Sequence, residues 1–235
     1  MLPYYYGFDY YYLVLVLPCI VLALWAQFKV KSTFGRYSQV MSRRHMTGAQ
    51  AAAAVLRANG VLGVRIERVA GNLTDHFDPR QNVIRLSQSV YDSPSVASIG
   101  VAAHEAGHAV QYAIGYGPMK LRAAIIPLTN LGSTLALPLI LIGFIFNYGP
   151  LITIGIAFFG FSTLFQLVTL PVELDASRRA LAAIRSGGLL YDDEYPMARK
   201  TLTAAAMTYV AALAVSLAQL LRLILLFGGR GRRDE

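Results

Sequence analysis

Two histidines and a glutamate stand in an otherwise small and apolar run, VAAHEAGHAVQ, at residues 101–111. His104 and His108 are four apart, so on a helix both imidazoles project from one face and can bind the same metal ion. Glu105 lies about 100° further around such a helix, where it can take a proton from a water on that metal. The spacing is therefore typical of a site at which one Zn²⁺ ion prepares water for attack on a carbonyl carbon.

The alternative is a core or membrane helix that contains this motif by accident. Two histidines and a carboxylate buried without a metal would carry a desolvation cost of several kcal/mol, which argues against a chance occurrence of the motif. Ala106 and Gly107 are small, which lets another backbone approach the helix closely. We therefore expect a metal site on this helix.

A catalytic zinc site needs a third protein ligand and an open position. The extended motif of the metzincins would need Gly at position 111 and His at 114, but the chain has Gln111 and Ile114 there, which excludes that class. The segment PVELDASRRALAAIR, residues 171–185, offers Glu173 and Asp175. These acids are two apart and cannot both point the same way on a helix, so one can ligate while the other solvates, caps or orients.

Four segments are long enough to cross a hydrocarbon core, which needs about 20 apolar residues. They are residues 10–28, 123–146, 150–171 and 204–227 of a 235-residue chain. The first lacks a basic stretch before it and a small-residue cleavage site, so we interpret it as a retained anchor. At 55% hydrophobic and 14% charged residues, the chain is too apolar for an ordinary soluble domain. The prediction is a mostly α membrane protein with about four transmembrane helices and a small α+β domain.

Basic residues set the expected orientation of these spans. None precedes the first span, whereas several follow it: Lys29, Lys31, Arg36, Arg43 and Arg44. This asymmetry predicts that residue 29 onward lies in the cytoplasm. The second and third spans are separated by only a few residues, so this hairpin returns residue 172 onward to the face that holds residues 29–122, where Glu173 can meet the two histidines. A crossing by the fourth span would put the basic tail outside, so an interfacial or re-entrant arrangement is the alternative.

The net charge of +8 could suggest a nucleic-acid partner, but the basic residues are scattered and form no stripe interleaved with aromatic residues. We therefore expect no nucleic acid, and we expect the lipid bilayer as a partner. Protein or peptide substrates are expected as well, whereas partner proteins and the oligomeric state stay unknown. Cys19 is the only cysteine, which excludes an intrachain disulfide and a thiolate metal cluster.

Residues 29–122 show the signals of a folded domain. Thr47 and Gln50 have capping-box spacing before an alanine-rich helix that Asn59-Gly60 should end. Two β-like runs, at 64–69 and 82–87, predict a hairpin. Ser93 and Pro94 then resemble the cap and first residue of the helix that carries the motif. The predicted division is 1–28 anchor, 29–122 motif domain, 123–171 transmembrane hairpin, 172–203 third-ligand region, and 204–235 last membrane segment and basic tail.

Five motifs together resemble the YugP-type neutral zinc metallopeptidases, a bacterial membrane family: LTDHFDPR, NVIRLS, VAAHEAGHAVQ, the following KLR, and VELDASRRA. The likeness covers nearly the whole chain and implies a zincin-like domain. A more distant resemblance is to HtpX-type and CAAX membrane proteases, whose third ligand is the Glu of ExxADxxA. Glu173, Ala176 and Ala180 match that pattern, which implies a gluzincin-like site. Ser177 stands where the pattern has Asp, so Ser177, Asp175 or another residue must support the ligating histidines.

The resemblance also implies that NVIRLS, with Ile84 and Leu86, is an edge strand along which an extended substrate pairs. An ordinary strand of a small sheet is the alternative. His76 could stabilise an oxyanion or accept a second metal, or it could belong with Asp75 and Asp78 to an Asx-type turn, which we favour because such clusters are usual in turns.

These observations predict a membrane-anchored zinc endopeptidase of the bacterial cell membrane, multi-pass, with its site facing the cytoplasm and membrane proteins as substrates. One alternative is a site-2-type intramembrane protease, but no span after residue 123 contains the aspartate which that class requires. The other is a proteolytically silent zinc-binding scaffold. A structural site has no use for an unligated carboxylate such as Glu105 beside its ligands, which favours the enzyme.

Overall fold

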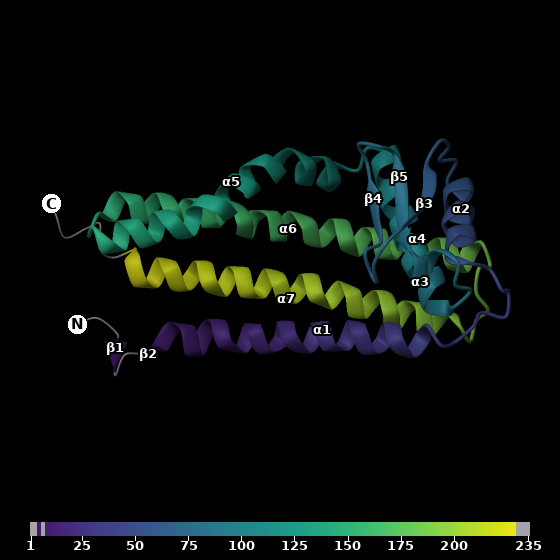
Figure 1. Ribbon diagram of the computed structural model, residues 1–235, viewed down its shortest axis with the longest axis horizontal. Coiled ribbons are helices and arrows are strands. Elements are labelled where there is room, and N and C mark those ends of the chain that lie inside the picture. The colour runs from purple at the N-terminus through teal and green to yellow at the C-terminus, as the bar shows by residue number, and fades with distance from the viewer. Residues whose placement is uncertain (1–3, 6–7, 229–235) are drawn as a thin grey trace. The chain divides into compact units, whose positions relative to one another are not determined.

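The computed structural model describes residues 4–5 and 8–228 and is mostly helical (Figure 1). The basic tail at 229–235 lies outside these residues. The helices are α1 (Leu17–Tyr37), which follows a π-helical turn at Tyr12–Val16, α2 (Gly48–Ala58), α3 (Gln88–Tyr91), α4 (Val96–Ala113), α5 (Gly117–Ile145), α6 (Gly149–Ser186) and α7 (Tyr195–Phe227). The strands are β1 (Tyr4–Tyr5), β2 (Phe8–Asp9), β3 (Arg65–Val69), β4 (His76–Asp78) and β5 (Val83–Ser87).

Four helical segments in the described residues are long and apolar enough to cross a membrane, as predicted. They are Tyr12–Tyr37, Gly117–Ile145, Gly149–Ser186 and Tyr195–Phe227, with mean hydropathies between 1.8 and 2.3. Each overlaps a predicted span and extends beyond it at one end or both. The fourth is one uninterrupted helix, whereas a re-entrant element would need a break.

The chain divides into two compact units. We call the first the apolar unit, which comprises Met1–Trp25, Leu121–Leu170 and Tyr209–Glu235, and the second the site unit, which comprises Ala26–Lys120 and Pro171–Thr208. In the apolar unit, Asp9 accepts a hydrogen bond from the backbone N–H of Tyr12 at 3.1 Å and pairs with Arg222, whose Nε lies 2.6 Å from Asp9 Oδ2. One carboxylate thus caps the first helical turn and neutralises a cation on α7.

The core of the site unit lies between α2, α4, the sheet and the end of α6. Helix α2 begins as predicted, because the side chain of Thr47 accepts from Gln50 N–H while the side chain of Gln50 accepts from Thr47 N–H. It ends at Asn59 and Gly60, where the positive φ of 65° suits glycine. The alanine-rich faces of α2 and α4 are buried, which lets these two helices pack closely.

The sheet corrects two predictions. Its order is β3-β5-β4, with β3 parallel and β4 antiparallel to β5. The hairpin is therefore formed by β4 and β5, because the segment between the two predicted runs supplies a third strand. As the central strand, β5 cannot offer a free edge to a substrate, and Ile84 and Leu86 are both fully buried. Apolar residues on both faces are typical of a strand covered on both sides.

The start of α4 also differs from the prediction. The cap is Ser95, whose side chain accepts from the N–H of Ser98 at 3.2 Å, and not Ser93. Pro94 lies before the helix, where its carbonyl accepts a hydrogen bond from Ser42 N–H at 2.9 Å. This long-range contact keeps the segment extended, and the helix can begin only after it.

Candidate functional site

The HEAGH motif lies in the middle of α4, and its side chains are mostly buried. The rings of His104 and His108 lie 4.7 Å apart, centroid to centroid, with an angle of 82° between their planes. Their side chains are 15% and 10% exposed, so one edge of the pair remains open to solvent. Two imidazoles on one helical face are thus placed to share an ion.

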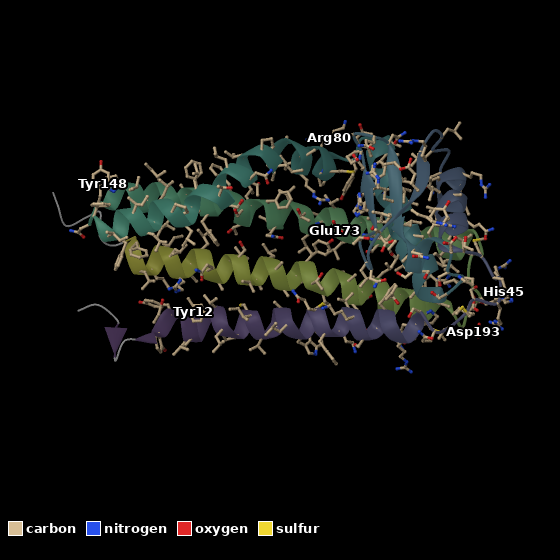
Figure 2. The ribbon with its side chains drawn as sticks, viewed as in Figure 1. Tyr12, His45, Arg80, Tyr148, Glu173 and Asp193 are labelled. Atoms are coloured by element: carbon tan, nitrogen blue, oxygen red, sulfur yellow. The ribbon has the colours of Figure 1, made fainter. Side chains whose placement is uncertain are left out.

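Glu173 lies on α6 (Figure 2), and its carboxylate lies close to both imidazoles. Its Oε2 lies 3.3 Å from His104 Nε2 and 3.5 Å from His108 Nε2. The ligand atoms of the three side chains all lie within 4.8 Å of one another, and they form the group of possible metal ligands found among the described residues. Two nitrogens and one carboxylate oxygen are the donors that zinc prefers, so this set fits the ion.

Burial and the neighbouring carboxylates act in opposite directions on the pKa of His108. Burial alone would lower the pKa of His108, but the hydrogen bond that Glu173 accepts from it and the negative charge of Glu105 raise the pKa above its ordinary value. Glu105, on the next position of the helix from His104, is itself buried at 8% exposure. The pair of carboxylates thus makes the site electronegative, as a cation requires.

Gly107 sets the distance between α4 and α6. A Cβ atom at this position would lie 2.7 Å from the carbonyl oxygen of Ala176, closer than real Cβ contacts allow. The two backbones therefore meet because position 107 has no side chain, as the sequence predicted for this pair of small residues. This contact brings Glu173, one helical turn before Ala176, to the level of the histidines.

Two side chains that follow Glu173 lie close to the cluster: Ser177 contacts His104 directly, and Asp175 contacts Gln111. The hydroxyl of Ser177 lies 3.1 Å from His104 Nδ1, so the residue that departs from the ExxAD pattern still lies against a histidine. Asp175 is held by Arg178 and by Arg179, whose Nε is 2.6 Å from Asp175 Oδ2. Asp175 also accepts from the amide of Gln111 at 2.9 Å.

Sequence reasoning missed Gln111, which is fully buried and lies 3.0 Å from His108 Nδ1. A signal existed, because Gln111 is a polar residue three positions after His108 in an apolar run. Its partners on α6 could not be inferred, since they depend on how the two helices are aligned.

The remaining candidates lie away from this cluster. Ile84 and Leu86 belong to the core, and His76 is exposed on β4 with its Nδ1 2.8 Å from the carbonyl of Thr74. Asp78 accepts hydrogen bonds from the backbone N–H groups of Arg80 and Gln81, at 2.9 and 3.3 Å, and so forms an Asx-type turn. The prediction that His76 and Asp75 belong to this turn is wrong, because His76 lies in β4 and Asp75 bonds to Ser87.

Asp75, beside His76, holds the end of β5. Its carboxylate accepts from Ser87 N–H at 2.7 Å and from the Ser87 hydroxyl at 3.1 Å. Burial raises the pKa of Asp75, although these hydrogen bonds oppose the shift. Asp75 therefore fastens the β4 end of the sheet to β5.

Long apolar helices together with a His-His-Glu cluster are the features expected of a membrane-associated metalloprotease. Residues 12–228 match the family described as "Putative neutral zinc metallopeptidase", and the chain belongs to that family. A relative, the "Putative membrane protease YugP" of Bacillus subtilis (strain 168), is 45% identical over 224 residues, which are 95% of this chain and 99% of that protein. No solved structure matches the chain. The predicted resemblance is thus confirmed.

Proposed function

We propose that the chain is a zinc-dependent endopeptidase that hydrolyses peptide bonds in protein substrates. One Zn²⁺ ion would be held by His104, His108 and Glu173, with Glu105 as the general base, which makes the site gluzincin-like. The observation that carries this proposal is the meeting of Glu173 with both imidazoles, at 3.3 and 3.5 Å, from a helix far away in the sequence.

Zinc in such a site supplies a Lewis acid that makes water more acidic and polarises the substrate carbonyl. Glu105 takes a proton from the attacking water and then gives it to the departing amide nitrogen, so that the carboxylate is restored at the end. The imidazoles would hold the ion through Nε2, because their Nδ1 atoms already face Ser177 and Gln111. The side chains of this site thus account for binding of the metal, activation of water and protonation of the leaving group.

The proposed substrates are membrane proteins, and the proposed location is the cytoplasmic side of the bacterial cell membrane in a multi-pass protein. Glu173 follows the predicted third span, residues 150–171, by two positions on the same helix. With a rise of about 1.5 Å per residue, the third ligand stands only a few ångströms along α6 from the apolar run. Peptide bonds close to the head groups are therefore the ones that this site would reach.

The test is to purify the full chain in detergent and to compare the wild type with Glu105→Gln. We expect Glu105→Gln to retain one zinc per chain and to lose at least about 100-fold in cleavage of casein or of a membrane protein, since proton transfer contributes that much. Glu67→Gln is a matched control, because Glu67 is a partly exposed residue of β3 paired with Arg65.

Equal cleavage by the wild type and Glu105→Gln would show that Glu105 is not the base. Zinc binding without any cleavage by the wild type would instead support a silent scaffold. Absence of zinc from the wild type would refute the metal site itself.

A further inference from the structure

We infer that Gln111 is a positioning residue: its amide locks His108 and Glu173 into register with each other before any metal binds. The inference rests on the proposed function, since it concerns the same metal ligands. It is carried by three hydrogen bonds of one buried side chain.

The orientation of the Gln111 amide is fixed by its partners. Its Nε2 lies 2.8 Å from the carbonyl oxygen of Val172 and 2.9 Å from Asp175 Oδ2. A carbonyl oxygen can only accept a hydrogen bond, and the same holds for an ionised carboxylate. The two amide hydrogens are thus directed to α6, which leaves Oε1 to face His108 Nδ1 at 3.0 Å. An amide oxygen only accepts, so His108 must donate from Nδ1.

This arrangement selects the form of His108 that can bind a metal. With the hydrogen on Nδ1, the neutral ring carries its lone pair on Nε2, the atom that faces Glu173. Gln111 has no solvent exposure, so water cannot compete for these bonds. Of the two neutral tautomers, the protein therefore favours the one whose Nε2 can bind a metal.

The same amide also fixes the position of the third ligand. Val172, whose carbonyl it binds, directly precedes Glu173, and Asp175 follows Glu173 by two residues. One side chain from α4 is thus bonded on both sides of the ligand that α6 supplies. Because Asp175 is charged and is held by two arginines, its bond to the amide is of the stronger, charge-assisted kind.

His104 is supported by a less specific hydrogen bond than His108, so the two histidines can be compared within the same site. Its Nδ1 faces the hydroxyl of Ser177 at 3.1 Å, and a hydroxyl can donate or accept. Ser177 therefore does not select a tautomer, whereas the Gln111 amide both accepts from His108 and donates to the residues on either side of Glu173. We expect the loss of Gln111 to weaken zinc binding more than the loss of Ser177.

The experiment measures the zinc affinity of the full chain in detergent by competition with a chelator, so that it does not depend on proteolysis. The variants are Gln111→Leu, Gln111→Glu, Ser177→Ala and the double variant Gln111→Glu with Asp175→Asn. Gln219→Leu makes the same replacement on α7 in the apolar unit and is the matched control.

We expect Gln111→Leu to weaken zinc binding by about 10- to 100-fold, the usual effect of losing an outer partner of a ligand. Gln111→Glu should also bind more weakly, because its second oxygen would face the Val172 carbonyl and the Asp175 carboxylate. The double variant should recover part of the loss, because the amide and the carboxylate have then exchanged places. A role in packing alone predicts no such recovery.

The melting temperature of each metal-free variant shows whether it folds. If Gln111→Leu does not fold, the comparison of Gln111→Glu with the double variant decides the question. Wild-type affinity in Gln111→Leu, or no recovery in the double variant, would overturn the inference while leaving the proposed function intact. Failure of the wild type to bind zinc would overturn the proposed function, and the inference with it.

Discussion

The two compact units treat charged residues in different ways. In the site unit, four carboxylates are buried, namely Glu105, Glu173, Asp175 and Glu194. In the described residues of the apolar unit, Asp9 is the single acid, and it is paired with Arg222. Both units obey the rule that a buried charge needs a partner, but only the site unit gathers several acids.

The residues that face the buried acids also have different roles in the two units. Asp9 and Arg222 neutralise each other, and Asp9 caps a helix turn, so this pair serves the stability of the apolar unit. In the site unit, Glu173 faces two imidazoles that would repel one another if both were charged, which is an arrangement that a metal ion would complete. A buried acid therefore indicates a metal site when its neighbours are other possible metal ligands, and a structural role when its neighbour is a single opposite charge.

The strongest challenge to this comparison is to remove the acids of the site unit one at a time. We expect Glu173→Ala to weaken zinc binding by more than the roughly 10- to 100-fold that an outer partner contributes, because a direct ligand is lost. Asp175→Ala should cause the smaller effect, about 10-fold, since it acts only through Gln111. Metal analysis of the two purified variants checks this order. Loss of zinc from Asp175→Ala alone would make our choice of ligand wrong.

A second test changes the spacing of the helices without touching a charge. Gly107→Ala places a Cβ atom 2.7 Å from the Ala176 carbonyl, and we expect it to reduce the free energy of unfolding by about 1–3 kcal/mol. Gly100→Ala is the control on the same helix, because its Cβ would meet Ala198 at an ordinary 3.6 Å. Thermal melting and zinc affinity of both variants are the measurements. Equal behaviour of the two would show that the close contact at Gly107 does not matter.

The smallest effect is expected in the apolar unit. Asp9→Asn keeps an oxygen that can accept from Tyr12 N–H, but it leaves Arg222 without its counter-charge. Because the two side chains are still 17% and 21% exposed, the charge left on Arg222 stays partly hydrated. We therefore expect a loss of stability below the roughly 3–5 kcal/mol of a fully buried pair, and no change in zinc affinity. Adding Arg222→Met should recover part of the loss. Reduced zinc affinity in Asp9→Asn would contradict the distinction between the two units.

Features that depend on neighbours in sequence could be predicted. Runs of apolar residues gave the long helices, and the Thr47–Gln50 spacing gave the start of α2. The four-residue spacing of His104 and His108 placed both rings on one face, since helical periodicity is a local property. The choice of Glu173 needed the resemblance to a known pattern as well, because Asp175 is chemically equivalent.

Features that depend on pairing between distant segments could not be predicted. The central position of β5 results from its parallel pairing with β3, which no turn signal between them encodes. Ser93 and Ser95 are equally good caps, and the choice between them is made by the contact of Pro94 with Ser42. The support of His108 by Gln111 likewise requires α6 to lie at one particular height along α4.

The missing side chain at Gly107 has a consequence for any survey of inactive variants. Glycine offers no donor atom, so position 107 can neither coordinate an ion nor move a proton. Yet a substitution there would displace the helix that carries Glu173, and the resulting protein would resemble one that has lost a ligand. Mutational scans that rank positions by lost activity should therefore score this position beside the histidines, although the 2.7 Å contact with Ala176 makes the cause steric.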